Sequence, residues 1–336
     1  YEPVSRPDSQ AIGKEIRPDT LSTILFTSGS TGRPKGVLHT HASLMHMTKR
    51  RSQLVRAGPS DAFTLFYSAS VMGGLSIVLY GFLNGGSLHP RDIRNDGFSD
   101  LEAWLRRQRN TCCHSVTSLY REYARHLGPG RSLPDLRLII LGGEQAYPAD
   151  VELGWKVFGP SIEFSCGIGS TEINTARQIP IPPGSKLPAG RMPFGFPVEG
   201  VEVIILDRNH RAVPAGETGE IAIRSRYLSL GYWRRPEETR KRFIPDPAGG
   251  KLTLYLTGDL GRIDATGCLH GAGRNDHQVK IRGFRVEPGE VNTHLMAQPG
   301  IREACTVAVK SKSGTLSLAA FFVTASDAKI TTADLH

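Results

Sequence analysis

The chain has 336 residues and a formal net charge of +9, and 39% of its residues are apolar and 22% charged. These values are typical of a folded protein with a large core and exclude a chain that is disordered throughout. The longest apolar stretches, such as residues 76–83, are far shorter than the roughly 18 residues that a membrane span needs. The five cysteines form neither a CxxC pair nor a Cys/His cluster, and no signal-peptide pattern opens the chain, so we expect a reducing, cytoplasmic location.

The N-terminal half of the sequence predicts an α/β layer. Apolar, strand-like runs at residues 21–25, 62–66 and 136–141 alternate with amphipathic stretches such as residues 41–56. Strands that alternate with helices favour a mostly parallel sheet with flanking helices. The proline and glycine clusters between residues 179 and 197 predict a linker.

The rest of the chain predicts smaller, strand-rich units. Short runs at residues 201–206, 219–223 and 251–255 lie between turn signals and predict a β-barrel-like subdomain. Residues 278–286 are strand-like, residues 288–297 helical, and residues 304–309 and 316–323 predict two strands. We therefore expect an α/β core over residues 1–185, a β-rich subdomain over residues 186–275 and a small α+β domain over residues 276–336.

A glycine- and hydroxyl-rich loop follows the first apolar strand. Residues 26–36 read Phe-Thr-Ser-Gly-Ser-Thr-Gly-Arg-Pro-Lys-Gly. Glycines let a backbone approach phosphate closely, hydroxyls and amides donate hydrogen bonds, and Lys35 supplies positive charge. The spacing is not that of the P-loop. Taken alone, the segment could equally be a polar turn rich in serine and glycine.

Four further motifs follow the loop in order, at residues 168–172, 255–260, 273–276 and 278–283. In order and spacing the set resembles the adenylate-forming superfamily: acyl-CoA synthetases, aryl-acid ligases, luciferases and adenylation domains of nonribosomal peptide synthetases. The resemblance runs from about residue 21 to the end and is strongest to adenylation domains. Members of the family carry a large N-terminal subdomain before the loop and a second lysine near the C-terminus. The resemblance therefore implies a partial adenylate-forming fold, with both of these parts missing.

The resemblance implies ATP-dependent, Mg²⁺-dependent activation of a carboxylic acid as an acyl-adenylate, with release of pyrophosphate. Lys35, Thr171 and Glu172 match the catalytic positions, and Glu172 matches the Mg²⁺ ligand; a surface salt bridge is the alternative for this carboxylate taken alone. Asp276 matches the hinge that precedes the small domain, and a simple turn is the alternative there. The positions that match the family's ATP and AMP contacts are Thr27, Ser28, Gly29, Ser30, Thr31, Gly32, Gly143, Glu144, Ile168, Asp259 and Arg274.

Four of these nucleotide positions carry further expectations. Asp259 matches the carboxylate that accepts the ribose hydroxyls. Ile168 stands where relatives carry an aromatic residue that stacks on adenine, so aliphatic packing would replace stacking. Gly143 and Glu144 match the adenine pocket, although a pair of glycines at a strand end, Gly142 and Gly143, is also a common tight turn.

The same matching predicts an acyl pocket formed by Tyr67, Ser68, Ala69, Met72, His114, Ile140, Gly142, Gly167, Thr175 and Ala176. Ser68 stands where adenylation domains carry an aspartate that pairs with the substrate ammonium group. A neutral hydroxyl gives no charge-assisted pair, so we expect a small carboxylic acid other than a standard α-amino acid. His114 is a candidate to bond a substrate hydroxyl or carboxylate, but a satisfied core histidine is the commoner case.

The acceptor is predicted from residues 278–290, which resemble adenylation domains that load carrier proteins. The expected acceptor is the phosphopantetheine thiol of an acidic acyl or peptidyl carrier protein. An acyl-CoA ligase and a catalytically impaired nucleotide-binding remnant are the alternatives. The basic cluster at residues 224–242 is most simply a solvated face, and without a nucleic-acid motif we expect no nucleic-acid partner.

Overall fold

A computed structural model of the chain describes residues 15–28, 34–131, 133–247, 249, 252–275, 278–281, 284–310 and 316–324. The described chain opens with an antiparallel pair, β1 (Leu21–Thr27) and β2 (Lys35–Thr40), followed by α1 (His41–Val55). Within the part of the chain that the structure describes, no helix is long and apolar enough to cross a membrane.

The first large sheet has seven strands in the order β4, β3, β5, β6, β7, β8, β9. The strands β4 through β7 run parallel, whereas β8 and β9 are antiparallel to their neighbours. Their bounds are β3 (Ala62–Leu65), β4 (Ser87–Pro90), β5 (Cys112–Val116), β6 (Leu138–Gly142), β7 (Glu163–Ser170), β8 (Asn174–Ile181) and β9 (Phe196–Pro197). The expected linker is thus shorter than residues 179–197, because its first three residues complete β8 and its last two form β9.

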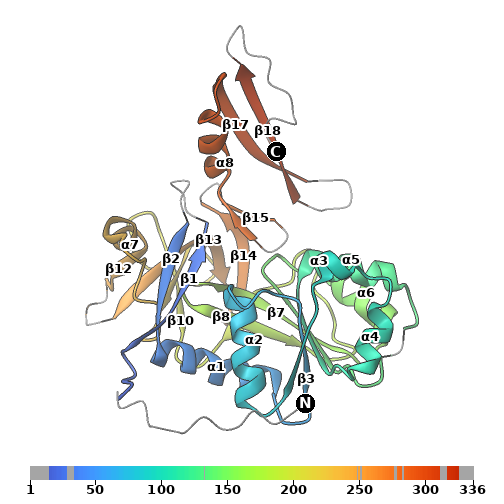
Figure 1. Cartoon of the computed structure of the whole chain (residues 1–336). Coiled ribbons are helices and arrows are strands. Elements are labelled where there is room, and N and C mark those ends of the chain that lie inside the picture. The colour runs from blue at the N-terminus through green and yellow to red at the C-terminus, as the bar shows by residue number, and fades with distance from the viewer. Residues whose placement is uncertain are drawn as a thin grey trace.

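Helices cover both faces of this sheet (Figure 1). They are α2 (Met72–Leu83), α3 (Ile93–Asp96), α4 (Leu101–Arg107), α5 (Thr117–Leu127) and α6 (Pro148–Phe158). Successive residues of one strand serve opposite faces: Ile139 packs with Tyr120 and Tyr123 of α5, and Ile140 packs with Tyr80 of α2. A strand buried on both faces needs a continuous apolar run, which is what residues 138–141 of β6 contain. The predicted mostly parallel α/β architecture is confirmed.

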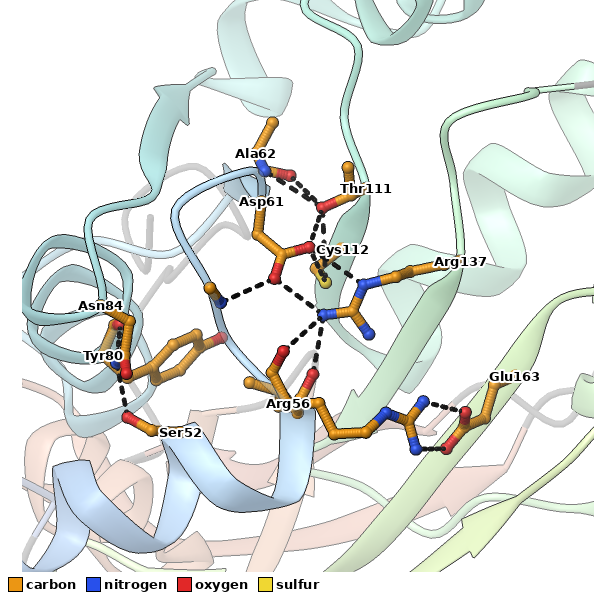
Figure 2. A network of polar contacts seen from close by, with 12 residues as sticks. Ser52, Arg56, Asp61, Ala62, Tyr80, Asn84, Thr111, Cys112, Arg137 and Glu163 are labelled. Atoms are coloured by element: carbon orange, nitrogen blue, oxygen red, sulfur yellow. Dashed lines mark hydrogen bonds and ion pairs between the residues drawn. The ribbon is translucent and has the colours of Figure 1, made fainter.

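A polar network ties the amino ends of the parallel strands together (Figure 2). Asp61, just before β3, accepts hydrogen bonds from the Thr111 hydroxyl at 2.6 Å and from Arg137 Nε and Nη2 at 3.0 and 2.9 Å. Arg137 also donates to the Val55 carbonyl at the end of α1 at 2.8 Å. Burial opposes ionisation, but the hydrogen bonds from Arg137, Thr111 and the Gly58 amide hold the pKa of Asp61 below its usual value. Ligands of open α/β sheets bind at the carboxyl ends of the strands, so this network at the opposite edge serves the fold.

The second sheet has five antiparallel strands, ordered β10, β11, β13, β12, with β14 also paired to β13. The bounds are β10 (Glu202–Leu206), β11 (Gly219–Arg224), α7 (Pro236–Arg242), β12 (Phe243–Pro245), β13 (Thr253–Ile263) and β14 (Leu269–Arg274). One apolar cluster joins the two sheets, since Ile168 and Ala176 of the first pack with Ile221, Ile223 and Tyr255 of the second.

The C-terminal part stands away from both sheets (Figure 1). A hairpin of β15 (Val279–Ile281) and β16 (Phe284–Val286) leads to α8 (Pro288–Met296), β17 (Ile301–Lys310) and β18 (Leu316–Thr324). The sequence is strand-like over residues 278–286, and the structure has the two short strands β15 and β16 there. The domain boundaries at residues 185 and 275 stay predictions, and the predicted hinge residue Asp276 lies outside the described residues.

Candidate functional site

The predicted phosphate loop joins β1 and β2, and Thr27 faces Lys35 directly across the pair. Gly36 allows close packing at the base of this hairpin, because a Cβ there would lie 2.8 Å from Ile24 Cγ2. The loop therefore connects two antiparallel strands, whereas a P-loop connects a strand to a helix. Of its predicted phosphate-binding residues, Gly29, Ser30, Thr31 and Gly32 lie outside the described part of the chain.

Lys35 is buried and contacts two side chains that the sequence had not indicated. Its Nζ lies 3.5 Å from Glu238 Oε2 of α7 and 5.0 Å from the centroid of the Tyr232 ring. The Tyr232 hydroxyl donates to Glu172 Oε1 at 2.8 Å. Backbone bonds fix this arrangement, since the Trp233 amide donates to the Gly36 carbonyl at 2.7 Å. One aromatic side chain, that of Tyr232, thus contacts both the predicted catalytic lysine and the predicted metal ligand.

Thr171 and Glu172 lie in the turn between β7 and β8, and Glu172 is only 1% exposed. His39 of β2 holds this turn, because its Nε2 lies 2.9 Å from the Thr171 carbonyl oxygen. Burial lowers the pKa of His39, against the opposing effects of that hydrogen bond and of the Glu172 charge. Since a carbonyl oxygen only accepts hydrogen bonds, a neutral His39 carries its proton on Nε2 and donates a hydrogen bond to the Thr171 carbonyl.

Glu172 suits a Mg²⁺ ion chemically. A carboxylate is the hard oxygen donor that Mg²⁺ prefers. The buried position of Glu172 limits the number of water molecules that compete with the carboxylate for the ion. The hydrogen bond from Tyr232 orients the carboxylate, as outer-shell partners of metal ligands commonly do.

Asp259, the predicted ribose contact, and Arg274, another predicted nucleotide contact, lie opposite each other on β13 and β14 and form an ion pair at 2.6 Å. The register between β11 and β13 shifts at this point, which marks a β-bulge. Gly258 has a φ of +76°, and the Thr257 hydroxyl accepts from the Asp259 amide at 3.0 Å. The Thr-Gly-Asp motif therefore bends the strand so that the Asp259 carboxylate meets Arg274.

The predicted adenine-pocket residues are fixed by local structure. Gly143 follows β6 with a φ of +75°, which favours glycine. Glu144 accepts from the Ser118 amide at 2.8 Å, in the first turn of α5. It also borders one small hollow together with Gly167. Ile168 is buried in the cluster between the two sheets. Adenine contacts by these residues stay predictions.

Tyr67, Ile140 and Gly142, three predicted acyl-pocket residues, lie next to a fourth, His114 of β5. His114 faces Ile140 across the two strands, and the rings of Tyr67 and His114 meet edge to face with centroids 5.3 Å apart. A Cβ on Gly142 would lie 3.4 Å from His114 Nε2. Burial, with a smaller effect of the Arg51 charge, lowers the pKa of His114 well below its usual value, so the imidazole is neutral.

The remaining acyl-pocket residues do not converge in the same way. Met72 is buried against β1 and α1, and Ala176 lies in the cluster between the sheets. Thr175 is 5% exposed and bonds its own neighbour Asn174. Ser68 and Ala69 are exposed, and the Ser68 hydroxyl accepts from the Ser70 amide. A pocket that unites all ten residues stays a prediction.

Several arginines of the basic cluster at residues 224–242 pair with nearby acids. Arg224 pairs with Asp246 at 2.7 Å and with Glu202 at 2.9 Å. Arg235 pairs with Glu238 at 3.6 Å, and Arg240 pairs with Glu237. These contacts agree with a solvated, charge-paired face.

Comparison with known proteins places this chain in a family. Residues 2–233 match the AMP-binding enzyme family. The chain is 36% identical over 327 residues to phosphinothricin tripeptide synthetase PhsC of Streptomyces viridochromogenes, covering 96% of this chain and 28% of the relative. It is 34% identical over 325 residues to chondramide synthase cmdD of Chondromyces crocatus, covering 95% of this chain and 8% of the relative. The chain thus spans a small part of the length of these two relatives.

Solved structures agree with the sequence relatives. The crystal structure of IdnL1 is 27% identical, with a TM-score of 0.81 over 98% of this chain and 66% of that one. The holo form of PA1221, a nonribosomal peptide synthetase protein containing adenylation and peptidyl carrier domains, is 25% identical, with a TM-score of 0.83 over 97% of this chain and 57% of that one. The chain belongs to the AMP-binding enzyme family, which confirms the predicted family, fold and enzyme class.

Proposed function

We propose that this chain activates a carboxylic acid with ATP, forming an acyl-adenylate and pyrophosphate, and then transfers the acyl group to a carrier-protein thiol. The observation that carries the proposal is the contact of Tyr232 with both Lys35 and Glu172. It joins the phosphate-loop lysine to the buried carboxylate of the Gly-Ser-Thr-Glu motif. A lysine and a metal-binding carboxylate that contact the same side chain are suited to stabilise the charge that develops during phosphoryl transfer.

In this proposal Mg²⁺, when bound, neutralises charge on the ATP phosphates, and Glu172 is its protein ligand. Thr27 and Ser28 at the end of β1 donate hydroxyl bonds to the phosphates, together with the residues 29–32. Asp259 and Arg274 bind the ribose side, and Thr171 contacts the α-phosphate. These roles rest on the family resemblance and on the positions described above.

Carboxylate-dependent exchange of pyrophosphate into ATP tests the first step in the full-length protein. Acid-dependent exchange would support the proposal, and ATP binding without exchange for any acid would indicate a nucleotide-binding remnant instead. Supplying acyl-AMP with either coenzyme A or carrier proteins then identifies the acceptor thiol. Acylation of coenzyme A alone would make the protein an acyl-CoA ligase.

The proposed substrate is an acid without an α-amino group, because Ser68 offers no charge to an ammonium. Ser68 is exposed, so a substituted aspartate would not be desolvated by the protein itself. The effect expected for Ser68→Asp is therefore repulsion of the substrate carboxylate and a severalfold lower exchange rate with non-amino acids. A clear preference of the unmodified enzyme for an α-amino acid would contradict this assignment.

A further inference from the structure

The turn between β13 and β14 brings together three side chains of the kinds that bind metal ions. Residues 264–268 connect the two strands, with Asp264 at the start of the turn and Cys268 at its end. His270 is the second residue of β14. A carboxylate oxygen of Asp264, the Cys268 sulfur and a ring nitrogen of His270 all lie within 4.8 Å of one another. Carboxylate, thiolate and imidazole are the three ligand types that Zn²⁺ binds in proteins.

Hydrogen bonds fix the direction of the Asp264 carboxylate. Its Oδ1 accepts from the amide and the hydroxyl of Thr266 at 2.9 and 2.6 Å and from the Cys268 amide at 3.1 Å. Its Oδ2 lies 2.7 Å from His270 Nε2. One oxygen therefore closes the turn, and the other points toward the imidazole. The sequence did not predict this set, because only the turn brings Asp264 back to His270.

The three side chains differ in their exposure. Cys268 is 6% exposed, whereas the side chains of Asp264 and His270 are 28% and 33% exposed. The start of β14 is also held in place, since the Leu269 amide donates to the Gly195 carbonyl at 2.9 Å. The sulfur thus has a fixed, buried position, and the other two ligand atoms are open to an ion that arrives from water.

The charges near the turn favour a metal that binds sulfur. Arg177 Nη1 donates to the Gly267 carbonyl at 2.8 Å, which places a positive charge next to the turn. This charge opposes cations that bind mainly to oxygen, such as Mg²⁺ and Ca²⁺. A metal that coordinates the Cys268 sulfur displaces the thiol proton and gains a second negative ligand besides Asp264. Soft thiolate ligands select Zn²⁺ over Mg²⁺ and Ca²⁺.

The separations suit a tetrahedral ion after small rotations of the side chains. Zn²⁺ binds sulfur at about 2.3 Å and nitrogen or carboxylate oxygen at about 2.0–2.2 Å, so its ligand atoms lie about 3.3–3.6 Å apart. The 2.7 Å contact between Asp264 and His270 has to open slightly, and both side chains are partly exposed. Oδ1 keeps its bonds within the turn while Oδ2 binds the ion.

We propose that Asp264, Cys268 and His270 form a binding site for a divalent cation of the Zn²⁺ class, with water as the fourth ligand. This site does not depend on the proposed function. The ion links the end of β13 to the start of β14. The register of these strands also places Asp259 opposite Arg274, so the ion would stabilise the hairpin that carries this pair.

Co²⁺ serves as the probe, because a thiolate ligand on tetrahedral Co²⁺ gives a charge-transfer band in the near ultraviolet. The reduced, metal-free, full-length protein should bind one Co²⁺ with this band. Zn²⁺ should displace the Co²⁺, and a large excess of Mg²⁺ should not. Cys268→Ser should abolish the band, and Asp264→Asn and His270→Gln should each weaken Co²⁺ binding at least about tenfold, because one of three protein ligands is lost. Cys305→Ser removes an exposed thiol of β17 and should leave the band unchanged.

The unmodified protein alone can overturn the proposal, whatever the stability of the variants. No Co²⁺ binding, or binding without the charge-transfer band, would exclude a site that contains Cys268. A band that persists in Cys268→Ser, or that disappears in Cys305→Ser, would place the ion elsewhere and also overturn the proposal. Asp264→Asn keeps an oxygen acceptor for the turn, so an unchanged Tm with weaker binding would support a direct ligand. Pyrophosphate exchange is not measured here, so failure of the proposed function leaves each of these outcomes distinct.

Discussion

At the scale of single residues, Tyr232 brings together two groups that the chain supplies from distant positions. Its ring lies under Lys35, and its hydroxyl orients the Glu172 carboxylate. A buried carboxylate held by a hydrogen bond keeps a fixed direction toward a ligand, which favours preorganised binding of a metal. The role proposed for Glu172 can therefore be tested separately from its orientation.

Glu172→Gln should reduce Mg²⁺-dependent pyrophosphate exchange at least about tenfold, because the amide keeps the acceptor for Tyr232 but loses the charge that binds a metal. The measurement is exchange rate against Mg²⁺ concentration, with Tm as a check on folding. Tyr232→Phe is the matched control, since it retains the ring under Lys35 and loses one hydrogen bond worth about 1 kcal/mol. Unchanged exchange by Glu172→Gln would remove this residue from the metal site.

Asp259→Ala should raise the KM for ATP about a hundredfold or more and leave the KM for the acid nearly unchanged. The variant loses the two hydrogen bonds expected to the ribose hydroxyls, each worth about 1.5–3 kcal/mol for a charged acceptor. It also frees Arg274 from its 2.6 Å ion pair. Thr266→Ala, in the exposed turn that follows β13, serves as the control. Similar changes in both KM values would indicate a general disturbance of the sheet.

The sequence could predict the residues that lie in contiguous motifs, but not those that act through distant packing. Thr171, Glu172 and Asp259 stand in short motifs whose spacing is visible along the chain. Tyr232 carries no local pattern, because its partners Lys35 and Glu172 come from segments that only the fold brings near. The motifs also did not predict which pocket residues are buried. Met72 and Ala176 fill apolar clusters, and Ser68 is exposed.

At the scale of elements, apolar runs in the sequence predicted most strands. Strand segments that contain polar motifs were not predicted. The sequence ended a strand at Tyr255, whereas β13 continues to Ile263 through a bulge at the Thr-Gly-Asp motif. A bulge lets turn-forming residues remain within a strand, which periodicity alone does not show. The seven-stranded order also depends on pairing between distant segments, which single elements do not specify.

The helix α1 gives a pH-dependent test of stability through His46. Its ring stacks on Tyr227 with centroids 3.7 Å apart. Burial is the largest cause that lowers the pKa of His46 to about 4, assisted by Arg50, Lys49 and Arg226 and opposed by Glu199. The unfolded chain binds this proton more readily, so its contribution to stability is complete above about pH 6.5 and is lost as the pH falls toward 4.

The free energy of unfolding should therefore decline between pH 6.5 and 4, and His46→Phe should flatten that decline while keeping the stacked ring. Denaturant unfolding at a series of pH values measures the difference between the two proteins. Because the ring is partly exposed, solvent screening makes the effect smaller than the pKa shift alone would give. Parallel curves for both proteins would show that His46 does not contribute to acid sensitivity.

At the scale of the whole molecule, the two large sheets share one apolar cluster. Ile168, Ile173 and Ala176 belong to the predicted α/β core, and Ile221, Ile223 and Tyr255 belong to the predicted β-rich subdomain. Elements that bury the same apolar surface lose their stability together. A boundary at residue 185 would therefore separate units of the sequence that fold as one, whereas the C-terminal part stands apart from them (Figure 1).

Ile221→Ala tests this cooperation, because the side chain is fully buried at 0% exposure within the shared cluster. Its truncation should cost about 2–5 kcal/mol through lost transfer energy and a residual cavity. In hydrogen exchange followed by mass spectrometry under mild denaturant, peptides of β5 and β6 should lose protection together with those of β10 to β13, while β17 and β18 keep theirs. Leu83→Ala, at a position 58% exposed on α2, should change none of these peptides by more than about 0.5 kcal/mol. If only the second sheet loses protection, the two sheets unfold separately and the boundary at residue 185 is a true domain boundary.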